Sequence, residues 1–198
     1  MSVATLRPDT LQRMEAAVDE VQNRAVRAAA RLAEDGIDYA IVGGHAVAAW
    51  VAQVDPEAVR NTKDVDILID RQRLTDVIRS LAREGFVHHN VDGIDLFIDG
   101  PDGSVRSGIH VVFAGEKVRG EHPTPAPGLG RTVDGTDFRV VDLEGLVQMK
   151  LAAFRLKDQV HLIDLIDVGL LDESWCDRVA EPLRDRLREV FERAEAER

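Results

Sequence analysis

The chain has only one cysteine, Cys176, among its 198 residues. A single thiol excludes an internal disulfide and any cysteine-cluster zinc site. The sequence also lacks an apolar run near the ~18 residues that a membrane-spanning helix needs. The first ten residues show no basic start followed by an apolar stretch, so we expect no signal peptide. These absences together predict a soluble, cytoplasmic protein without a membrane partner.

Basic side chains are in the minority, with 25 lysines and arginines against 36 acidic residues and a net charge of -11. The pI near 5.0 argues against a protein that coats nucleic acid through general electrostatics. It leaves open a nucleic-acid end held in one local basic pocket. The 44% hydrophobic and 31% charged content is ordinary for a globular protein, and the length suits one domain or a core with a helical appendage.

Hydrophobic periodicity predicts alternating helices and strands in the first half. A helix is expected from Thr10 to about Asp35, closed by Gly36. Its apolar residues recur at threes and fours and predict one buried stripe: Leu11, Met14, Val18, Val21, Ala25, Ala28 and Leu32. The next expected elements are a strand at 37–42, a helix at 45–53, a loop at 55–60, a strand at 62–70 and a helix at 75–84.

The second half is predicted to hold two more strands, at about 94–98 and 105–113, and then a surface segment rich in proline and glycine at 115–131. A short strand at 138–141 and helices at 143–156, 159–170 and 174–196 follow. This order implies an α/β protein with a small mixed sheet and flanking helices. The expected parts are an N-terminal helix packed on the core (1–36), the α/β core (37–120), a surface loop (121–137) and a C-terminal helical region (138–198).

The strongest chemical pattern joins Gly43-Gly44, at a strand-to-helix turn, with Asp64 and Asp66 on the next strand. Side chains alternate along a strand, so the two carboxylates project from one face and repel each other unless they share a cation or a proton. Mg²⁺ prefers carboxylate and phosphate oxygens. The glycines allow a phosphate to approach the amides of a helix N-terminus. Each feature alone is most often structural, but the combination predicts a site for a metal-bound nucleoside triphosphate.

On these residues the chain resembles the polymerase-β-like nucleotidyltransferase superfamily. Within it, the chain is most similar to the abortive-infection type toxin nucleotidyltransferases and their uncharacterised relatives. Those proteins show a GG-x-A-V turn, a T-x-D-x-D strand, a later helical lysine and an R-x-K-D segment. The corresponding residues here are 43–47, 62–66, Lys150 and 155–158. The resemblance spans roughly residues 37–171.

The resemblance implies a nucleotidyltransferase fold and a two-metal transfer of a nucleoside monophosphate from an NTP to a hydroxyl, with release of pyrophosphate. Asp64 and Asp66 would hold two Mg²⁺ or Mn²⁺ ions together with the NTP. The nucleotide-binding residues would be Gly43, Gly44, His45, Lys63 and Lys150, with Arg155 and Lys157 as further candidates. The acceptor would be RNA, including transfer RNA, a protein or a small molecule. Each of these assignments has a plainer structural alternative. Lys150 could extend to the surface, His45 could face solvent, and Lys157-Asp158 could belong to a solvated helix face.

The strand at 107–113 departs from the family pattern, because His110 stands where catalytic members carry a third carboxylate. A neutral imidazole can act as a general base, but it suits Mn²⁺ or Zn²⁺ better than Mg²⁺. Asp95, on the neighbouring strand, could replace the missing carboxylate if the register allows it. The alternative is a nucleotide-binding regulator that does not turn its nucleotide over.

The remaining polar candidates are interpreted as structural. His88 and His89 are adjacent and should face opposite ways on a strand, which disfavours a shared metal. His161 and Asp164 suggest a surface pair one helical turn apart, and Cys176 suggests simple packing. Four arginines on and before one helix suggest a solvated face: Arg71, Arg73, Arg79 and Arg83. A third hypothesis is a scaffold, a homodimer formed through the N-terminal helix.

Overall fold

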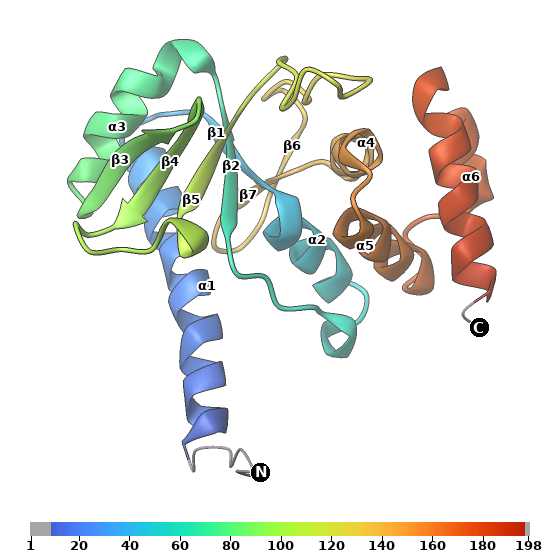
Figure 1. Cartoon of the computed structure of the whole chain (residues 1–198), viewed down its shortest axis with the longest axis horizontal. Coiled ribbons are helices and arrows are strands. Elements are labelled where there is room, and N and C mark those ends of the chain that lie inside the picture. Colours follow the sequence, from blue (N-terminus) through green and yellow to red (C-terminus); the bar gives the residue numbers. More distant parts are fainter. Residues whose placement is uncertain (1–8, 197–198) are drawn as a thin grey trace, which may run out of the picture.

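A computed structural model describes residues 9–196. The expectation that the chain has no signal peptide concerns residues 1–10, of which 1–8 lie outside the described residues. A mixed seven-stranded sheet forms the centre, in the order β3-β4-β5-β2-β1-β7-β6 (Figure 1). The strands are β1 (Tyr39–Val42), β2 (Val65–Ile69), β3 (Phe86–Val91), β4 (Ile94–Asp99), β5 (Ile109–Phe113), β6 (Thr132–Asp134) and β7 (Arg139–Val141). The predicted α/β class with a mixed sheet is therefore confirmed.

Strand pairing decides which side chains meet. The central strand β2 is antiparallel to β1 and parallel to β5, and Asp66 on β2 lies opposite His110 on β5. β1 also pairs in parallel with β7, while β3–β4 and β6–β7 form antiparallel pairs at the two edges. Because directly paired residues project from the same face, this register brings Asp66 and His110 together.

Helices pack around the sheet in two groups (Figure 1). α1 (Thr10–Glu34) packs on β1, β2 and α3 (Leu74–Ala82), and α3 packs on β3. α2 (Gly43–Ala52) packs on β2, α4 and α5. The C-terminal helices α4 (Leu143–Ala153), α5 (Leu156–Asp167) and α6 (Glu181–Ala196) pack on one another. Short 3₁₀ helices are η1 (Pro56–Ala58), η2 (Arg71–Arg73), η3 (Val105–Ser107) and η4 (Glu173–Asp177).

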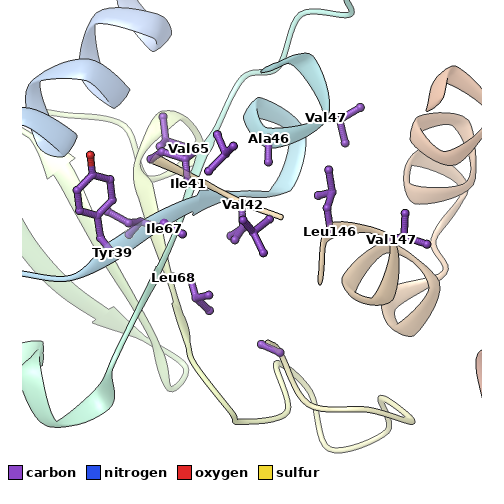
Figure 2. Close-up of a cluster of buried hydrophobic side chains, with 14 of the residues drawn as sticks. Tyr39, Ile41, Val42, Ala46, Val47, Val65, Ile67, Leu68, Leu146 and Val147 are labelled. Carbon is purple, nitrogen blue, oxygen red and sulfur yellow. The ribbon is translucent and has the colours of Figure 1, made fainter. Parts of the chain in front are cut away.

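One hydrophobic core holds the central strands against α2 and α4 (Figure 2). Val42 and Ala46 flank the turn between β1 and α2, and both are fully buried. Leu146 and Val147 of α4 are also fully buried in the same cluster. Each buried aliphatic side chain of this size stabilises the fold by about 1.5–3 kcal/mol. The ends of β1 and β2 are therefore fixed in place, which matters because they carry the candidate site.

The predicted stripe along α1 is only partly correct. Burial begins at Val21 and continues to Leu32, whereas Leu11 is 74% exposed and Met14 is 61% exposed. The reason is geometric: the helix is longer than the sheet that it covers, so its first turns extend away from the body (Figure 1). Periodicity identifies the helix but cannot tell where its packing partner ends.

Several other boundaries differ from the predictions. β6 was not expected, and β3 was anticipated only as an extended segment at His88 and His89. The strand predicted at 105–113 begins only at Ile109, after η3. α4 ends before Phe154, which adopts a left-handed conformation (φ 50°). The helix predicted at 174–196 is interrupted, and α6 begins at Glu181, because Pro182 is tolerated only in a first helical turn. Among the described residues, no helix has the length and apolar character to cross a membrane.

Candidate active site

Two carboxylates and an imidazole converge where β2 and β5 lie side by side. One ligand atom from each of Asp64, Asp66 and His110 can be chosen so that all three lie within 4.8 Å of one another. His110 Nδ1 is 3.9 Å from Asp64 Oδ2 and 3.8 Å from Asp66 Oδ1. All three side chains are partly exposed, so the cluster opens to solvent. Carboxylate oxygens and imidazole nitrogen are donors that suit a divalent cation.

The electrostatics of the cluster favour a cation. Burial, and then the neighbouring Asp64 carboxylate, raise the pKa of Asp66 above its ordinary value. A raised carboxyl pKa means that the negative form is costly unless positive charge is near. The hydroxyl of Thr62 donates to Asp64, 3.3 Å from its Oδ1, and so helps to orient that carboxylate.

The glycine turn between β1 and α2 lies directly against this cluster. Gly43 has a φ of +68°, and a Cβ built on it would lie 1.9 Å from Asp66 Oδ2. A Cβ on Gly44 would lie 2.6 Å from the Oγ1 of Thr62. Any larger residue would displace the side chains that form the acidic cluster. Both glycines are therefore required by close approach, and at Gly43 also by the backbone conformation.

A cavity of about 620 Å³ opens beside the cluster. It is lined by Gly43, Gly44, Lys63, Asp64 and Asp66 on one part of its wall, and by residues of η3, the 114–131 loop, α4, α5 and α6 elsewhere. Among its lining residues, the basic side chains are Lys63, Arg106, Arg119, Lys150, Arg155, Lys157 and Arg186, and the acidic ones are Asp64, Asp66, Glu121 and Asp158. Seven positive charges thus face four negative ones inside a protein whose net charge is -11.

His45 does not line this cavity. Its side chain is buried, and Nδ1 lies 3.2 Å from the backbone oxygen of Asp64. Burial lowers the pKa of His45, which favours a neutral ring that donates to this carbonyl. In this structure His45 supports the backbone of Asp64 and is neither solvent-facing nor directed at the cavity. Its assignment as a nucleotide ligand stays an untested prediction.

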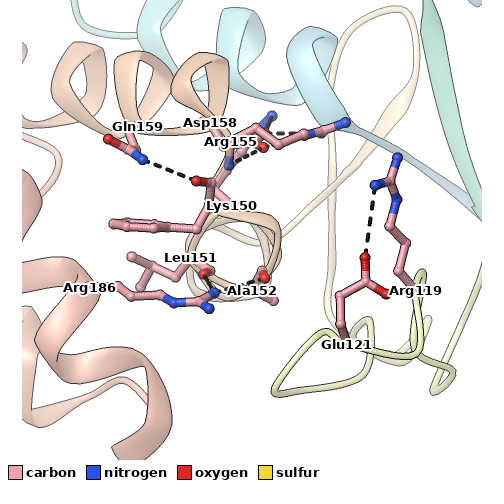
Figure 3. A network of polar contacts seen from close by, with 10 residues as sticks. Arg119, Glu121, Lys150, Leu151, Ala152, Arg155, Asp158, Gln159 and Arg186 are labelled. Carbon is pink, nitrogen blue, oxygen red and sulfur yellow. Dashed lines mark hydrogen bonds and ion pairs between the residues drawn. The ribbon is translucent and has the colours of Figure 1, made fainter.

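Lys150 belongs to a buried charge cluster on the cavity wall (Figure 3). Its Nζ lies 3.2 Å from Asp158 Oδ1, and Arg155 Nε lies 2.7 Å from Asp158 Oδ2. Asp158 is 1% exposed, so the interpretation of Lys157-Asp158 as a solvated helix face is wrong for Asp158, whereas Lys157 is exposed. Lys150 is 4% exposed and does not reach to the surface. Burial lowers the pKa of Lys150, and Asp158 and Asp66 oppose that effect.

The structure excludes Asp95 as a replacement carboxylate. Leu96, not Asp95, is paired with His110, so Asp95 projects from the opposite face of the sheet. There it is held by His88 Nε2 at 2.9 Å and by the Asn90 amide at 3.0 Å. His88 is therefore a partner of a buried carboxylate. This is a structural role of the kind expected for the His88-His89 pair.

The predicted surface pair of His161 and Asp164 is also wrong. Asp164 pairs with Arg60 at 2.8 Å, whereas His161 lines the cavity. Burial, and then the positive charge of Lys150, lower the pKa of His161 to about 4. Arg71 is exposed, in line with the solvated-face interpretation, and there it stacks on Phe113 and donates two hydrogen bonds to Glu116.

The sequence analysis missed several cavity residues, among them Arg119, His122 and Arg186. They come from the 114–131 loop and from α6 and carry no recognisable motif. Only the tertiary structure brings them to the cavity that Asp64 and Asp66 also line.

Comparisons with known proteins identify the fold. No protein-family model matches the chain. A curated relative, the glutamine-hydrolyzing GMP synthase of Symbiobacterium thermophilum, is 29% identical over 135 residues; the match covers 60% of this chain and 24% of that protein. The chain thus spans about a quarter of the length of that relative.

Two solved structures of the antibiotic-resistance factor ANT(2'')-Ia are similar over nearly the whole chain. The solution structure has a TM-score of 0.54 and 16% identity and covers 91% of this chain and 97% of that one. The crystal structure, in complex with adenylyl-2''-tobramycin, has a TM-score of 0.50 and 16% identity and covers 88% and 98%. ANT(2'')-Ia is a nucleotidyltransferase, and identity this low shows the fold alone. The chain has the nucleotidyltransferase fold.

Proposed function

We propose that this protein is a metal-dependent nucleotidyltransferase that transfers a nucleoside monophosphate from an NTP to a hydroxyl acceptor. The observation that carries the proposal is the cluster of Asp64, Asp66 and His110, whose two carboxylates line a basic cavity beside the Gly43-Gly44 turn. In this reaction the acceptor oxygen forms a bond to the α-phosphorus, and the bond between the α-phosphorus and the pyrophosphate oxygen breaks. Pyrophosphate leaves, and the acceptor hydroxyl loses its proton.

The acidic cluster would hold the divalent cation. Asp64 and Asp66 supply oxygen ligands and His110 supplies a nitrogen, and their mutual distances fit shared ligation. Such a cation, when bound, neutralises charge on the phosphates and aligns the reacting oxygens. We propose Mg²⁺ or Mn²⁺ in the two-ion arrangement with NTP; of the two, the imidazole favours Mn²⁺.

The glycine turn and the buried lysine would position the triphosphate. The absence of side chains at Gly43 and Gly44 allows a phosphate to approach the start of α2, where exposed backbone amides attract anions. Lys63 and Lys150 line the same cavity and supply positive charge. Asp158 holds Lys150 in place, so that the ammonium stays on the cavity wall.

His110 also supports a second candidate, a nucleotide-binding regulator with weak or absent turnover. An imidazole in place of a carboxylate lowers the negative charge available for metal binding. It also offers a nitrogen that can accept the proton of the acceptor hydroxyl. The two candidates therefore differ in turnover and not in nucleotide binding.

Acceptor and biological role belong to the proposal as well. RNA, including transfer RNA, a partner protein or a small molecule each provides a hydroxyl, and ANT(2'')-Ia binds an adenylylated aminoglycoside. The resemblance to abortive-infection toxins adds a toxin–antitoxin role in the cytoplasm, which remains a proposal.

The test is incorporation of label from each α-³²P-labelled NTP, with Mg²⁺ or Mn²⁺, into transfer RNA, total protein or tobramycin. The parent chain should label one acceptor class, and Asp66→Asn should abolish that labelling. Arg79→Ala, on α3 and outside the cavity lining, is the matched control and should label normally. Incorporation that survives Asp66→Asn contradicts the proposal. Activity in His110→Asp alone, with none in the parent, favours the regulator.

A further inference from the structure

The cavity has a second wall, remote in sequence from the acidic cluster, that concentrates positive charge. Arg119 comes from the 114–131 loop, Arg155 from the start of α5 and Arg186 from α6, and all three line the cavity together with His122. Figure 3 shows Arg186 against Leu151 and Ala152 of α4, and Arg119 beside Glu121 on the loop. We call Arg119, His122, Arg155 and Arg186 the arginine wall.

The members of this wall are close enough to act on one another. Burial and the positive charges of Arg119, Arg155 and Arg186 lower the pKa of His122, whereas Glu121 raises it. All four side chains line one cavity, so three guanidinium groups from three elements share it with this imidazole. Like charges gathered this way repel unless anions separate them.

The carboxylates that face the wall only partly neutralise it. Asp158 is shared between Arg155 and the buried Lys150. Glu121 lies 3.9 Å from Arg119, and both side chains are mostly exposed, so this pair is weak. Arg186 donates to the backbone oxygens of Leu151 and Ala152, at 2.7 Å and 2.9 Å, and no carboxylate among the described residues forms an ion pair with it.

The loop that carries Arg119 and His122 is closed at its base. The backbone amide of Ala126 donates to the Glu116 oxygen at 2.8 Å, and that of Gly115 donates to the Ala126 oxygen at 3.2 Å. The Gln148 side chain of α4 donates to the Pro125 oxygen at 3.0 Å. These bonds fix the base of the loop against α4, so the wall is a built feature of the fold.

The net charge of the cavity lining indicates the charge of the acceptor that the wall would bind. Its side chains carry a surplus of three positive charges. The charges of an NTP and of two divalent cations largely cancel each other, so a positive surplus persists when the proposed substrates are bound. A polycationic acceptor would be repelled, whereas an acceptor that carries phosphate would be attracted.

We propose that the arginine wall is the acceptor subsite and that it binds phosphate groups next to the acceptor hydroxyl, on a mononucleotide or at a nucleic-acid end. Arginine suits this role because its planar fork donates two parallel hydrogen bonds to phosphate. The protein's net charge of -11 would repel a long polyanion elsewhere, so contact is limited to the terminal nucleotides. The role of the wall as acceptor subsite rests on the proposed function. Phosphate binding by the wall does not, and it can be measured without turnover.

The experiment measures binding of the full-length protein, in EDTA and without NTP, to a fluorescent ten-nucleotide RNA and, separately, to AMP. Arg119→Ala should weaken binding about tenfold, in line with the loss of a charge-assisted hydrogen bond. Arg79→Ala, on the exposed face of α3, is the matched control and should bind as the parent does. His122→Ala is a second variant and should also weaken binding. Among the described residues, His122 forms no ion pair with an acidic residue, so this substitution breaks none. Affinity should also fall as salt rises.

The two ligands, AMP and the ten-nucleotide RNA, distinguish the two sources of phosphate. Equal loss of AMP and RNA binding assigns the wall to a single terminal phosphate, and loss of RNA binding alone assigns it to a nucleic-acid end. Unchanged binding of both ligands in Arg119→Ala and His122→Ala overturns the inference. So does tighter binding of an acidic peptide or of spermine than of either phosphate ligand. If RNA binds through the wall but no NTP is incorporated, the proposed function and the acceptor role fail, whereas phosphate binding by the wall stands.

Discussion

Gly43 begins α2 and Asp66 lies on β2, yet a Cβ on Gly43 would lie 1.9 Å from the Oδ2 of Asp66. The Asp66 carboxylate therefore fills the space that a side chain at position 43 would occupy. This contact links the two strongest sequence motifs physically: the turn is glycine because the carboxylate is there. It also supplies a direct test of the site.

Gly43→Ala is expected to destabilise the fold and to displace Asp66. The left-handed backbone alone costs a residue with a Cβ about 1–2 kcal/mol, and the clash adds to this. Gly36→Ala is the matched control, because Gly36 has a similar φ of +64° with nothing within 4 Å of its Cβ position. Urea unfolding and Mn²⁺ titration should show a stability loss in both variants and weakened metal binding in Gly43→Ala alone. Equal metal binding in the two would contradict the contact.

Asp158→Asn should destabilise the protein by about 3 kcal/mol, because it leaves the buried Lys150 ammonium without its partner. Asp76→Asn on α3 removes a carboxylate from exposed pairs with Arg73 and Arg79 and should cost about 1 kcal/mol or less. Chemical denaturation of both variants at pH 7 provides the comparison. A similar small loss in both would show that Lys150 is not held by Asp158.

The same pair predicts an acid response. Burial raises the pKa of Asp158, but the hydrogen bond and charge of Arg155, together with Lys150, outweigh it and leave the pKa below its ordinary value. A depressed carboxyl pKa stabilises the fold above the unfolded value, and this contribution is lost as the pH falls through the folded value. The stability difference between the parent and Asp158→Asn should thus be constant near neutrality and shrink below about pH 4.

His161 predicts a pH effect in a different window. Its folded pKa of about 4 lies below the ordinary value of about 6.5, so the unfolded chain takes up a proton first as the pH falls. Stability should therefore stay flat above about pH 6.5 and drop below it, and between pH 7.5 and 5.0 it should drop by about 2 kcal/mol more in the parent than in His161→Phe. Urea midpoints at pH 7.5 and 5.0 test this, and parallel pH curves for the two proteins would refute the burial of a neutral His161.

His110→Asp should change which metal is preferred. The parent, with one imidazole among its three ligands, is expected to bind Mn²⁺ about tenfold or more tightly than Mg²⁺, and a third carboxylate should narrow that ratio. Competition calorimetry on both proteins gives the ratio. An identical ratio in the variant would mean that His110 does not ligate the cation.

The sequence predicted the acidic cluster because its elements are local. Alternation along β2 and the glycine turn require only short segments, and the structure places Asp64, Asp66 and His110 together as the β2–β5 register demands. The fold class was predictable for the same reason, since hydrophobic periods of two and three to four residues separate strands from helices.

The rest of the site depends on contacts between distant segments. The burial of Asp158 needs α4 and α5 to meet, and the exclusion of Asp95 needs the β4–β5 register. Arg119 and Arg186 reach the cavity from a loop and from the last helix, without any periodic signal. The exposed start of α1 was mispredicted since a hydrophobic stripe does not reveal the size of the surface beneath it.

The central claim is tested most directly by thermal unfolding with each NTP, with and without Mn²⁺ or Mg²⁺, beside the Asp64→Asn/Asp66→Asn double variant. A ligand at about 100 times its Kd stabilises the fold by about 2.7 kcal/mol, which shifts the midpoint by several degrees. The account predicts a shift that requires both NTP and metal and that is absent in the double variant. No shift with any nucleotide and metal, or an equal shift in the double variant, would contradict it.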